Sequence, residues 1–327
     1  MDLSIIVPVY NVEKYIRPSI ESIFRQGLLE ACFEVIIVND GSTDKSMEEI
    51  ADIILQHSNV VVINQENQGL SVARNNGIAM AKGDYILMVD SDDMLIEKSI
   101  HPLLEKGLET KADLIVADFL AMNDEEIGNN QGVIQHHIEF KEKSGEQLFL
   151  EDLHPYQCYV WRTLYRREFL LKKQLAFIPR ISYEDIPFTH ECYLKAKRCL
   201  RTHQLIYIYR RERQGAITSS YDIEIAHDFC TAIAKTWELR HLPGLSPAVL
   251  YKLNDDVYTS FSLIIYKSLY TFKDSSFLNN IIDDLKQKAP DIKFSHGIKQ
   301  KIETFLFRSF PHLYIYLRIL HFKWTKR

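Results

Sequence analysis

The feature that most constrains the fold of this chain is an alternation that fills its first hundred residues. Short runs rich in Val and Ile are separated by longer amphipathic segments. Parallel strands need a crossover connection, which is usually a helix, so this alternation is typical of a parallel sheet wrapped by helices. The sequence therefore predicts an α/β fold. The expected strands are residues 4–9, 33–39, 60–64 and 85–89, and the expected helices are residues 13–25, 44–56 and 70–81.

Sequence signals also mark the ends of two of these helices. Ser42 or Thr43 is a suitable N-cap for helix 44–56. Gly83 lies just beyond helix 70–81, where we expect it to act as the C-cap glycine.

Beyond residue 110 the pattern is less regular. We expect a strand at 112–117, a loop at 123–131, a strand at 133–138, a helix from Ser144 and a late strand at 205–209. From Asp222 the spacing of apolar residues is helical to the end, with a break at residues 242–244. We therefore expect two domains, an α/β domain of residues 1–220 and a helical region of residues 221–327.

Polar residues follow each of the four early strands. Ligands of such sheets bind beyond the carboxyl ends of the strands, so these residues are the first candidates for a site. The four sets are Pro8-Val9-Tyr10-Asn11, Asp40-Gly41-Ser42, Asn67-Gln68-Gly69 and Asp90-Ser91-Asp92-Asp93.

The last of these sets suits a divalent cation. Asp90 and Asp92 are separated by one residue at the end of a strand, and Mg²⁺ and Mn²⁺ take oxygen ligands that they often share with substrate phosphates. The alternative is a solvated acidic turn that caps a helix beginning near Ile96.

Three further positions carry chemistry with an open alternative. Asp40 and Tyr10 suit a nucleotide pocket, in which an acid accepts from the base or ribose and an aromatic ring stacks on the base, although DGS is also a common turn. Arg74 would pair with a phosphate or an active-site carboxylate, or with a surface acid. Glu184 and Asp185 stand before Pro187, which favours a helix start, so they would be a general base or a helix cap.

Taken together, these segments resemble the inverting family-two glycosyltransferases of the GT-A fold, of the type that builds bacterial surface polysaccharides. The resemblance covers about residues 1–220 and implies a mostly parallel, Rossmann-like sheet between helices, followed by a C-terminal helical appendage. The matching segments are residues 4–11, 34–44, 67–75, 83–86, 89–93 and 184–185.

The resemblance implies a role for each candidate residue. Asp185 would be the catalytic base, supported by Glu184, and Asp92 would reach the metal on the diphosphate. Trp161 and Arg210 would lie on the acceptor side. The nucleotide-sugar-binding set would be Pro8, Val9, Tyr10, Glu13, Asp40, Arg74, Asp90 and Ser91. His190, His203 and the pair His136-His137 match no motif and are expected to be structural or surface residues.

The implied reaction is a metal-assisted single displacement. A divalent ion, Mg²⁺ or Mn²⁺, would stabilise negative charge on the departing phosphate of a nucleoside diphosphate sugar, for which UDP is the expected nucleotide. The base would activate a hydroxyl of a glycan or lipid-linked acceptor, so the anomeric centre would invert. Capsule, O-antigen or exopolysaccharide synthesis is the expected setting.

Two other functions remain open. A sugar nucleotidyltransferase uses a similar sheet, but its glycine-rich loop would replace residues 8–15, which contain no glycine. A non-catalytic nucleotide-sugar-binding subunit of a polysaccharide assembly would not need Asp185. A dehydrogenase or P-loop NTPase is disfavoured because GxGxxG and Walker A loops are absent from the sequence.

Composition narrows the setting. With 39 basic and 44 acidic residues the net charge is −5, so no nucleic-acid partner is expected. Five cysteines without a CxxC pair argue against disulfides and a zinc knuckle. The N-terminus lacks a secretory signal pattern and no apolar run is long enough to span a bilayer, so we expect a cytoplasmic protein.

The last 35 residues differ from the rest of the chain. From Lys293 onward the sequence contains eight Lys and Arg residues and one acid, Glu303. The net charge of this segment is therefore +7, and that of residues 1–292 is −12. Basic residues interleaved with rings are typical of a helix on anionic lipid, which would place the protein peripherally on the inner face of the membrane. The alternative is packing on its own domain or on a second subunit. Seven aromatic residues are interleaved with the basic ones: Phe305, Phe307, Phe310, Tyr314, Tyr316, Phe322 and Trp324.

Overall fold

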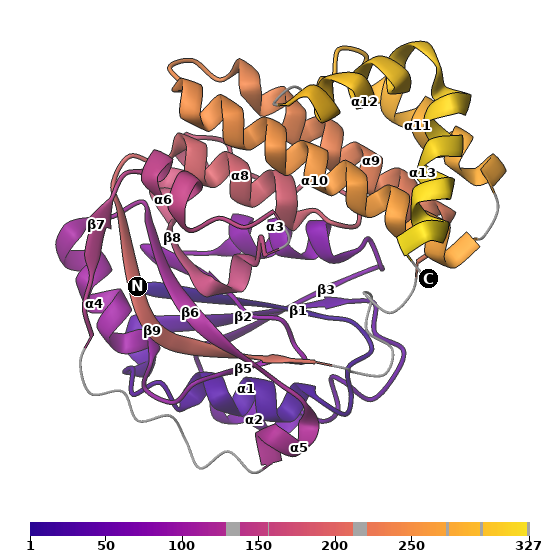
Figure 1. Ribbon diagram of the computed structural model, residues 1–327. Helices are drawn as coiled ribbons and strands as arrows, with labels where there is room; N and C mark the ends of the chain where they lie inside the picture. The colour runs from indigo at the N-terminus through magenta and orange to yellow at the C-terminus, as the bar shows by residue number, and fades with distance from the viewer. Residues whose placement is uncertain (129–137, 156, 212–220, 273–274, 295–296, 326–327) are drawn as a thin grey trace. The chain divides into compact units, whose positions relative to one another are not determined.

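The computed structural model describes residues 1–128, 138–155, 157–211, 221–272, 275–294 and 297–325 (Figure 1). The chain divides into two compact units, each described below by itself. The helical unit includes two segments from within the first 220 residues. Unit 1 comprises Met1–Leu148, Tyr159–Arg180 and Lys195–Ala216, and unit 2 comprises Phe149–Cys158, Ile181–Leu194 and Ile217–Arg327.

Unit 1 is built on one curled sheet. Across the described residues, nine strands pair in the order β3-β2-β1-β4-β8-β6-β9-β5, with β7 paired to β9. Strands β3, β2, β1 and β4 are mutually parallel, as the sequence predicts, whereas β8 joins them antiparallel and pairs in the same way with β6. The strands are β1 (Leu3–Val9), β2 (Phe33–Asp40), β3 (Val60–Gln65), β4 (Tyr85–Met88), β5 (Met94–Leu95), β6 (Leu114–Met122), β7 (Lys141–Lys143), β8 (Thr163–Arg166) and β9 (Cys199–Arg210).

Helices make up the rest of both units. Those seen in unit 1 are α1 (Ile16–Phe24), α2 (Ala51–Gln56), α3 (Leu70–Met80), α4 (Ile100–Thr110), α5 (Asp124–Gly128) and α7 (Arg167–Lys172). The others are α6 (Gly145–Glu151), α8 (Asp185–Lys195), α9 (Ile223–Glu238), α10 (Pro247–Phe272), α11 (Ser275–Lys288), α12 (Ile298–Ser309) and α13 (Pro311–Thr325).

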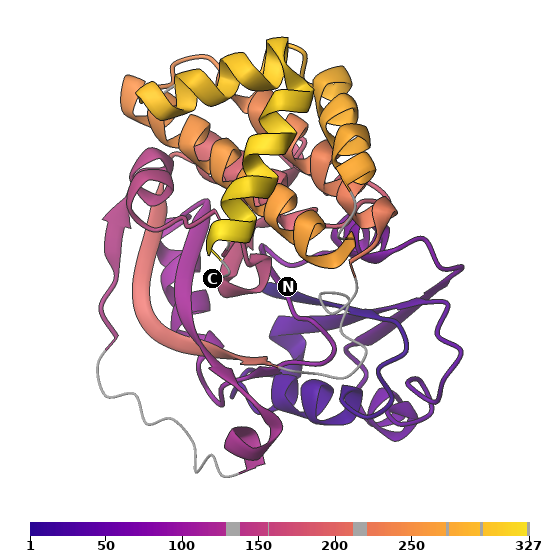
Figure 2. The ribbon, with the colours of Figure 1, turned by 45° about the vertical axis from the view of Figure 1, so that its right-hand side comes forward.

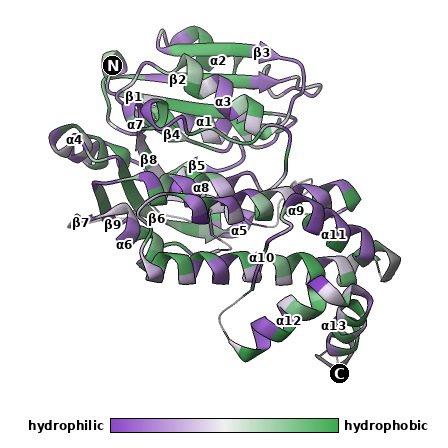
Figure 3. Ribbon diagram, turned by 90° about the horizontal axis from the view of Figure 1, so that it is seen from above, coloured by the Kyte–Doolittle hydropathy of each residue, from purple (hydrophilic) through white to green (hydrophobic). Residues whose placement is uncertain are grey.

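The early strands are buried on both faces, which explains their unbroken apolar runs. All seven residues of β1 are buried. Ile5 belongs to the same core cluster as Ile20 of α1, while a side chain on Gly77 of α3 would collide with Ile6. Neighbouring residues of β1 therefore pack against different helices, and Figure 1 shows α1 and α3 on opposite faces of the sheet. Figure 3 shows the same strands as largely hydrophobic.

Two predicted helix signals are wrong. Helix α2 begins at Ala51 rather than at residue 44, and its N-cap is Ile50, so neither Ser42 nor Thr43 caps it. The polar groups of residues 42–46 instead bind the loop after β1, as described below. Helix α3 ends with Ala81 as its C-cap. Gly83 instead packs closely against the backbone of β1.

Later elements also depart from the prediction. The expected loop at 123–131 contains the short helix α5, which begins at Asp124. The expected strand at 133–138 falls almost entirely outside the described residues. Both β6 and β9 are longer than predicted, and the register between them shifts around Asp118. All five cysteines are free thiols, as predicted.

Unit 2 is helical, and its core is aromatic. Asp222 caps α9 by accepting a hydrogen bond from the backbone N–H of Ile225 at 2.9 Å. The predicted break near residue 242 separates a short 3-10 turn (Leu239–His241) from α10. Phe261 of α10 stacks on Phe294 with ring centroids 4.7 Å apart. Within the described residues, no helix combines the length and apolar character needed to cross a bilayer.

Candidate active site

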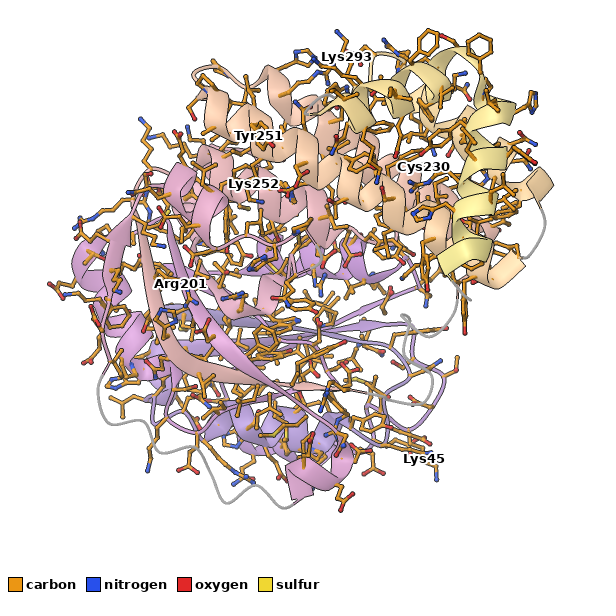
Figure 4. All side chains as sticks on the ribbon, in the orientation of Figure 1. Lys45, Arg201, Cys230, Tyr251, Lys252 and Lys293 are labelled. Carbon is orange, nitrogen blue, oxygen red and sulfur yellow. The ribbon has the colours of Figure 1, made fainter. Side chains whose placement is uncertain are left out.

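The loops after β1 and β2 are joined side by side by polar side chains. Asn11, which has a left-handed backbone with φ of 49°, accepts hydrogen bonds from the backbone N–H groups of Thr43 (2.8 Å) and Asp44 (3.3 Å). Glu13 accepts one from the backbone N–H of Lys45 at 3.1 Å. Figure 4 labels Lys45 on this loop. The carboxylate of Glu13, predicted to bind the nucleotide sugar, thus holds the two loops together.

Asp44 reinforces the same junction. Its carboxylate accepts from the backbone N–H of Glu13 at 3.0 Å and from the backbone N–H of Ser46 at 3.0 Å. Burial alone would raise the pKa of Asp44, but these bonds and one from the Ser46 hydroxyl lower the pKa below its usual value. The carboxylate is therefore held in its charged form, as a fixed part of the loop.

Asp40 connects the end of β2 to the start of α3. It is 3% exposed, and its carboxylate accepts hydrogen bonds from the backbone N–H groups of Gln68 (2.8 Å) and Gly69 (2.9 Å) and from the side chain of Gln65. Gly69 has φ of +87°, a conformation that favours glycine. Asp40 therefore positions the loop that leads into α3.

The predicted residues of β1 divide by exposure. Pro8 and Val9 are buried within the strand, while Tyr10, the first residue beyond it, is 47% exposed. Tyr10 is therefore the member of this set whose ring is open to a ligand.

Arg74 and Asp90 form an ion pair at the carboxyl end of β4. The guanidinium is 3% exposed and lies 2.7 Å from the carboxylate, which is 26% exposed. The ring of Phe177 lies 5.2 Å from the guanidinium carbon. Because Arg74 is buried, the alternative of a surface ion pair is wrong. The pair fixes one face of Asp90 and leaves part of the carboxylate open.

Two residues without a predicted role of their own anchor the aspartate turn. Asp93 is 2% exposed, and its carboxylate accepts from the Tyr207 hydroxyl at 2.9 Å and from the backbone N–H of Arg210 at 2.7 Å. The same hydroxyl accepts from the backbone N–H of Asp90 at 3.0 Å. Burial, with the charges of Asp92 and Asp90, raises the pKa of Asp93 well above its usual value. The sequence offered one sign of the role of Asp93, which is the third acid of the motif. It offered no sign of the role of Tyr207.

Arg210 lies against the same turn. Its Nε donates to the backbone carbonyl of Asp92 at 2.8 Å, and the guanidinium carbon lies 4.9 Å from the ring centroid of Tyr15. It also pairs with Asp124 of α5. Its predicted role was on the acceptor side, and these contacts place it beside the predicted metal ligand.

Trp161 is the centre of an aromatic cluster. It is 3% exposed, and its ring stacks on Tyr207 at 4.1 Å, on Tyr159 at 4.7 Å and on Tyr209 at 5.7 Å. Phe119 meets it edge-on at 4.8 Å. Burial is the main cause that raises the pKa of Tyr209 to about 12. The ring of Trp161 is thus enclosed, and it supports the tyrosine that holds the aspartate turn.

The turn suits a divalent cation shared with a diphosphate. Asp92 is only partly exposed and Asp90 keeps an open face, so the oxygen ligands are of the right kind. Burial is the main cause that raises the pKa of Asp93, and the charges of Asp92 and Asp90 add to it, so a cation beside these acids would offset their mutual repulsion. In the part of the chain that the structure describes, no group of three or more acids, His and Cys forms a complete metal site.

Glu184 and Asp185 belong to unit 2, where Asp185 is the first residue of α8. Glu184 is 8% exposed, while Asp185 is partly exposed. The segment before them is anchored: Ser182 donates its backbone N–H to Asp228 at 2.9 Å, and the ring of Tyr183 stacks on Phe229 at 4.1 Å.

His190 supports α8 from within. It is fully buried, with Nδ1 2.8 Å from the carbonyl oxygen of Ile186 and Nε2 3.2 Å from Asp256. Lys252, labelled on α10 in Figure 4, donates to Asp256 at 2.6 Å. His190 is thus structural, as predicted, and His203 is exposed and pairs with Asp118. His136 and His137 lie outside the described residues.

Within unit 1, one edge of the sheet thus gathers a partly open aspartate turn, a buried arginine and an exposed aromatic ring. This arrangement is typical of the ligand-binding edge of an α/β protein. Residues 4–171, about half of the chain, match the sequence profile of Glycosyl transferase family 2, and the chain belongs to that family.

Named relatives agree with this membership. "Uncharacterized glycosyltransferase EpsJ" of Bacillus subtilis is 36% identical over 218 residues, covering 66% of this chain and 62% of that protein. "Poly(ribitol-phosphate) beta-glucosyltransferase" of Bacillus spizizenii is 29% identical over 218 residues, covering 66% of this chain and 33% of that protein. The chain thus spans less than two thirds of the length of either relative.

The fold matches that of S. aureus TarS residues 1–349 in complex with UDP-GlcNAc. The TM-score is 0.74 at 20% identity, covering 99% of this chain and 92% of that chain. The predicted fold class, a GT-A fold with a helical C-terminal region, is confirmed.

Proposed function

We propose that this protein is an inverting glycosyltransferase that moves a sugar from a nucleoside diphosphate donor to an acceptor hydroxyl. The observation that carries the proposal is the turn after β4, where buried Arg74 fixes Asp90 and leaves Asp92 partly exposed. Family membership gives the reaction class. The solved complex of TarS with UDP-GlcNAc supports a UDP sugar as donor.

The donor side is assigned to unit 1. Tyr10 stacks on the base, and Asp90, held by Arg74, borders the nucleoside. Asp92 would hold Mg²⁺ or Mn²⁺. When bound, this ion supplies Lewis-acid stabilisation of the negative charge on the leaving phosphate. Asp40, Glu13 and Asp44 act indirectly. Their carboxylates position the loops of the donor site, because they already accept hydrogen bonds from the backbone of those loops.

The acceptor side is assigned to Asp185 as general base, with Glu184 as its support. Asp185 removes the proton from the acceptor hydroxyl, which attacks the anomeric carbon on the face opposite the leaving diphosphate. One displacement inverts that carbon, so an α-linked donor gives a β-linked product. Trp161 acts indirectly, because its ring stacks on Tyr207, whose hydroxyl holds the aspartate turn.

The acceptor is proposed to be a glycan or a lipid-linked oligosaccharide in the synthesis of a bacterial surface polymer. One relative is named for glucosyl transfer to poly(ribitol-phosphate), which supports an acceptor of this general kind. Such acceptors lie at the inner face of the cell membrane, where we place the protein as a peripheral enzyme.

The direct test is a panel of nucleoside diphosphate sugars incubated with the full chain and Mg²⁺ or Mn²⁺. The expected result is slow release of nucleoside diphosphate from one donor without acceptor, and faster release with an acceptor glycan. A nucleotidyltransferase would instead consume a nucleoside triphosphate and release pyrophosphate. A non-catalytic subunit would bind a donor and release nothing.

A further inference from the structure

Helices α12 and α13 are the last two elements of unit 2, and some of their aromatic side chains belong to its hydrophobic core. Phe307 and Tyr314 are each 1% exposed. Both pack edge-on or stacked against Phe261 of α10, with ring centroids 5.2 and 6.0 Å away. These two rings anchor the helices to their own unit, so they are unavailable to a membrane. The sequence-based reading of all seven aromatic residues as membrane anchors is therefore wrong for this pair.

Many of the other apolar side chains of the two helices are exposed. Ile298, Ile302 and Phe305 repeat at helical spacing along α12 and are 80%, 53% and 58% exposed. Figure 2 shows the two helices next to one another, and Figure 3 shows hydrophobic and hydrophilic residues alternating along both. Natural monomers rarely expose so many large apolar residues together. The exposed apolar residues in the α13 segment are Phe310, Leu313, Tyr316, Leu317 and Leu320, each between 43% and 58% exposed.

The charge around this apolar face is positive. Lys299, Lys301 and Arg308 are exposed on α12, and Lys293, labelled in Figure 4, precedes the helix. Glu303 is the only acid after Asp291 in the sequence. Its side chain is 12% exposed and accepts from the Tyr258 hydroxyl at 3.0 Å. It also pairs with Arg318 at 3.5 Å and with Lys299 at 4.0 Å, so one acid is shared between two cations and the segment keeps an excess of positive charge.

A groove between the two helices combines both properties. Its volume is about 450 Å³, and its lining includes Ile302 and Leu306 of α12 and Leu317 of α13 together with Lys299, Glu303 and Arg318. Apolar side chains beside an excess of positive charge match the chemistry of a phospholipid, whose acyl chains are apolar and whose headgroup is anionic.

We propose that the outward face of α12 and α13 binds the surface of a bilayer that contains anionic lipid. The exposed apolar side chains enter the boundary between headgroups and acyl chains, and the lysines and arginines meet the lipid phosphates. A second copy docked through the same face would bring a net charge of +7 against another +7, so charge favours the lipid. This inference rests on the surface of unit 2 and does not depend on the proposed glycosyl transfer.

The test uses substitutions, because removal of residues 293–327 would also remove the core rings Phe307 and Tyr314. One variant replaces three apolar side chains, Ile302→Ser, Phe305→Ser and Leu317→Ser. A second reverses three charges, Lys299→Glu, Lys301→Glu and Arg308→Glu. The matched controls are Leu29→Ser with Leu55→Ser, which are 74% and 87% exposed in unit 1, and Lys172→Glu on α7.

The assay is sedimentation with vesicles of phosphatidylcholine, with and without 30 mol% phosphatidylglycerol. The full chain should bind the anionic vesicles at low salt. The charge variant should lower the partition constant by at least roughly 100-fold, since each of its three cations contributes about a five-fold factor near the surface. The apolar variant should lower the partition constant as well, because its side chains no longer insert into the bilayer. High salt should weaken the electrostatic part only. The controls should bind as the parent does, and circular dichroism should verify that every variant is folded.

Three results would overturn the inference. The full chain could ignore anionic vesicles at low salt, or the controls could lose binding as much as the triple variants. Alternatively, sedimentation velocity could reveal a dimer that the apolar triple variant dissociates, which would assign the face to a second copy. Donor hydrolysis is measured on the same proteins without vesicles, so failure of the proposed function is distinguished from failure of lipid binding.

Discussion

The hydroxyl of Tyr207 offers a selective test of how the aspartate turn is held. Tyr207→Phe removes one oxygen and leaves the ring that stacks on Trp161 at 4.1 Å. That oxygen accepts from the backbone N–H of Asp90 and donates to the carboxylate of Asp93, at 3.0 and 2.9 Å. The substitution therefore breaks both bonds to the turn without opening a large cavity.

The expected cost follows from the two groups left behind. A buried polar group that loses its partner costs about 1–3 kcal/mol. Two such groups, one of them a carboxyl that still holds the backbone N–H of Arg210, give a loss of roughly 2–4 kcal/mol in the free energy of unfolding. For a domain of this size that corresponds to a fall of about 5–10 °C in Tm. A turn displaced by a fraction of an ångström should also lower kcat/KM for the donor by about tenfold or more.

Calorimetry and donor-hydrolysis kinetics measure the two effects, and Tyr209→Phe is the matched control. Tyr209 lies two residues further along β9, and its ring also stacks on Trp161. Loss of its hydroxyl should change Tm by less than about 2 °C, the scale of a minor substitution. If Tyr207→Phe and Tyr209→Phe proved equally mild in both assays, Tyr207 would be a packing residue and would not position the turn.

Two predictions concern the proposed chemistry. Asp92→Ala should abolish the dependence of nucleoside diphosphate binding on Mg²⁺ or Mn²⁺ in calorimetric titration, with folding retained because the carboxylate is partly exposed; full turnover of the parent enzyme in EDTA would contradict this role. Asp185→Asn should lower transfer by roughly 10²–10⁴-fold and leave the donor Kd near the parent value. A collapse of donor affinity in that variant would make Asp185 a structural or metal-binding group.

The early part of the fold was predictable because its determinants are local. The apolar runs of β1 and β2 are continuous because both faces of these strands are buried, and a run of that kind is visible in the sequence itself. The same holds for part of the candidate site: Asp40 and Asp90 lie at or near strand ends whose positions the pattern already determines, and Arg74 lies in the predicted helix that became α3.

The contacts that hold the site were not predictable, because they join distant residues. Tyr207 is 114 residues from Asp93, and the register of β9 that brings them together shifts twice against β6. Helix α2 starts late for a related reason. Asp44 and Ser46, which read as helix-start residues, form hydrogen bonds with Glu13 and Val12 of another loop.

Gly83 can be interpreted as a helix C-cap or as a site of close backbone packing, and the two interpretations predict different costs for Gly83→Ala. As a helix C-cap it would tolerate Ala at a cost of about 1 kcal/mol. In the structure, a Cβ on this buried residue would lie 2.4 Å from the backbone N of Ser4 and 2.5 Å from the carbonyl carbon of Leu3. Those atoms belong to the central strand β1, which pairs on both sides, so they cannot yield as a side chain would.

Gly83→Ala should therefore destabilise the protein by at least about 3 kcal/mol, the upper range for overpacking. It would also strain the hydrogen bond from the backbone N–H of Gly83 to the Ser4 hydroxyl, which is 2.8 Å long. Gly128→Ala is the control, because a Cβ there meets no atom within 4 Å. Denaturant unfolding of both variants measures the difference. A loss near 1 kcal/mol for Gly83→Ala would support the capping role and refute the close approach of the segment between α3 and β4 to β1 at this residue.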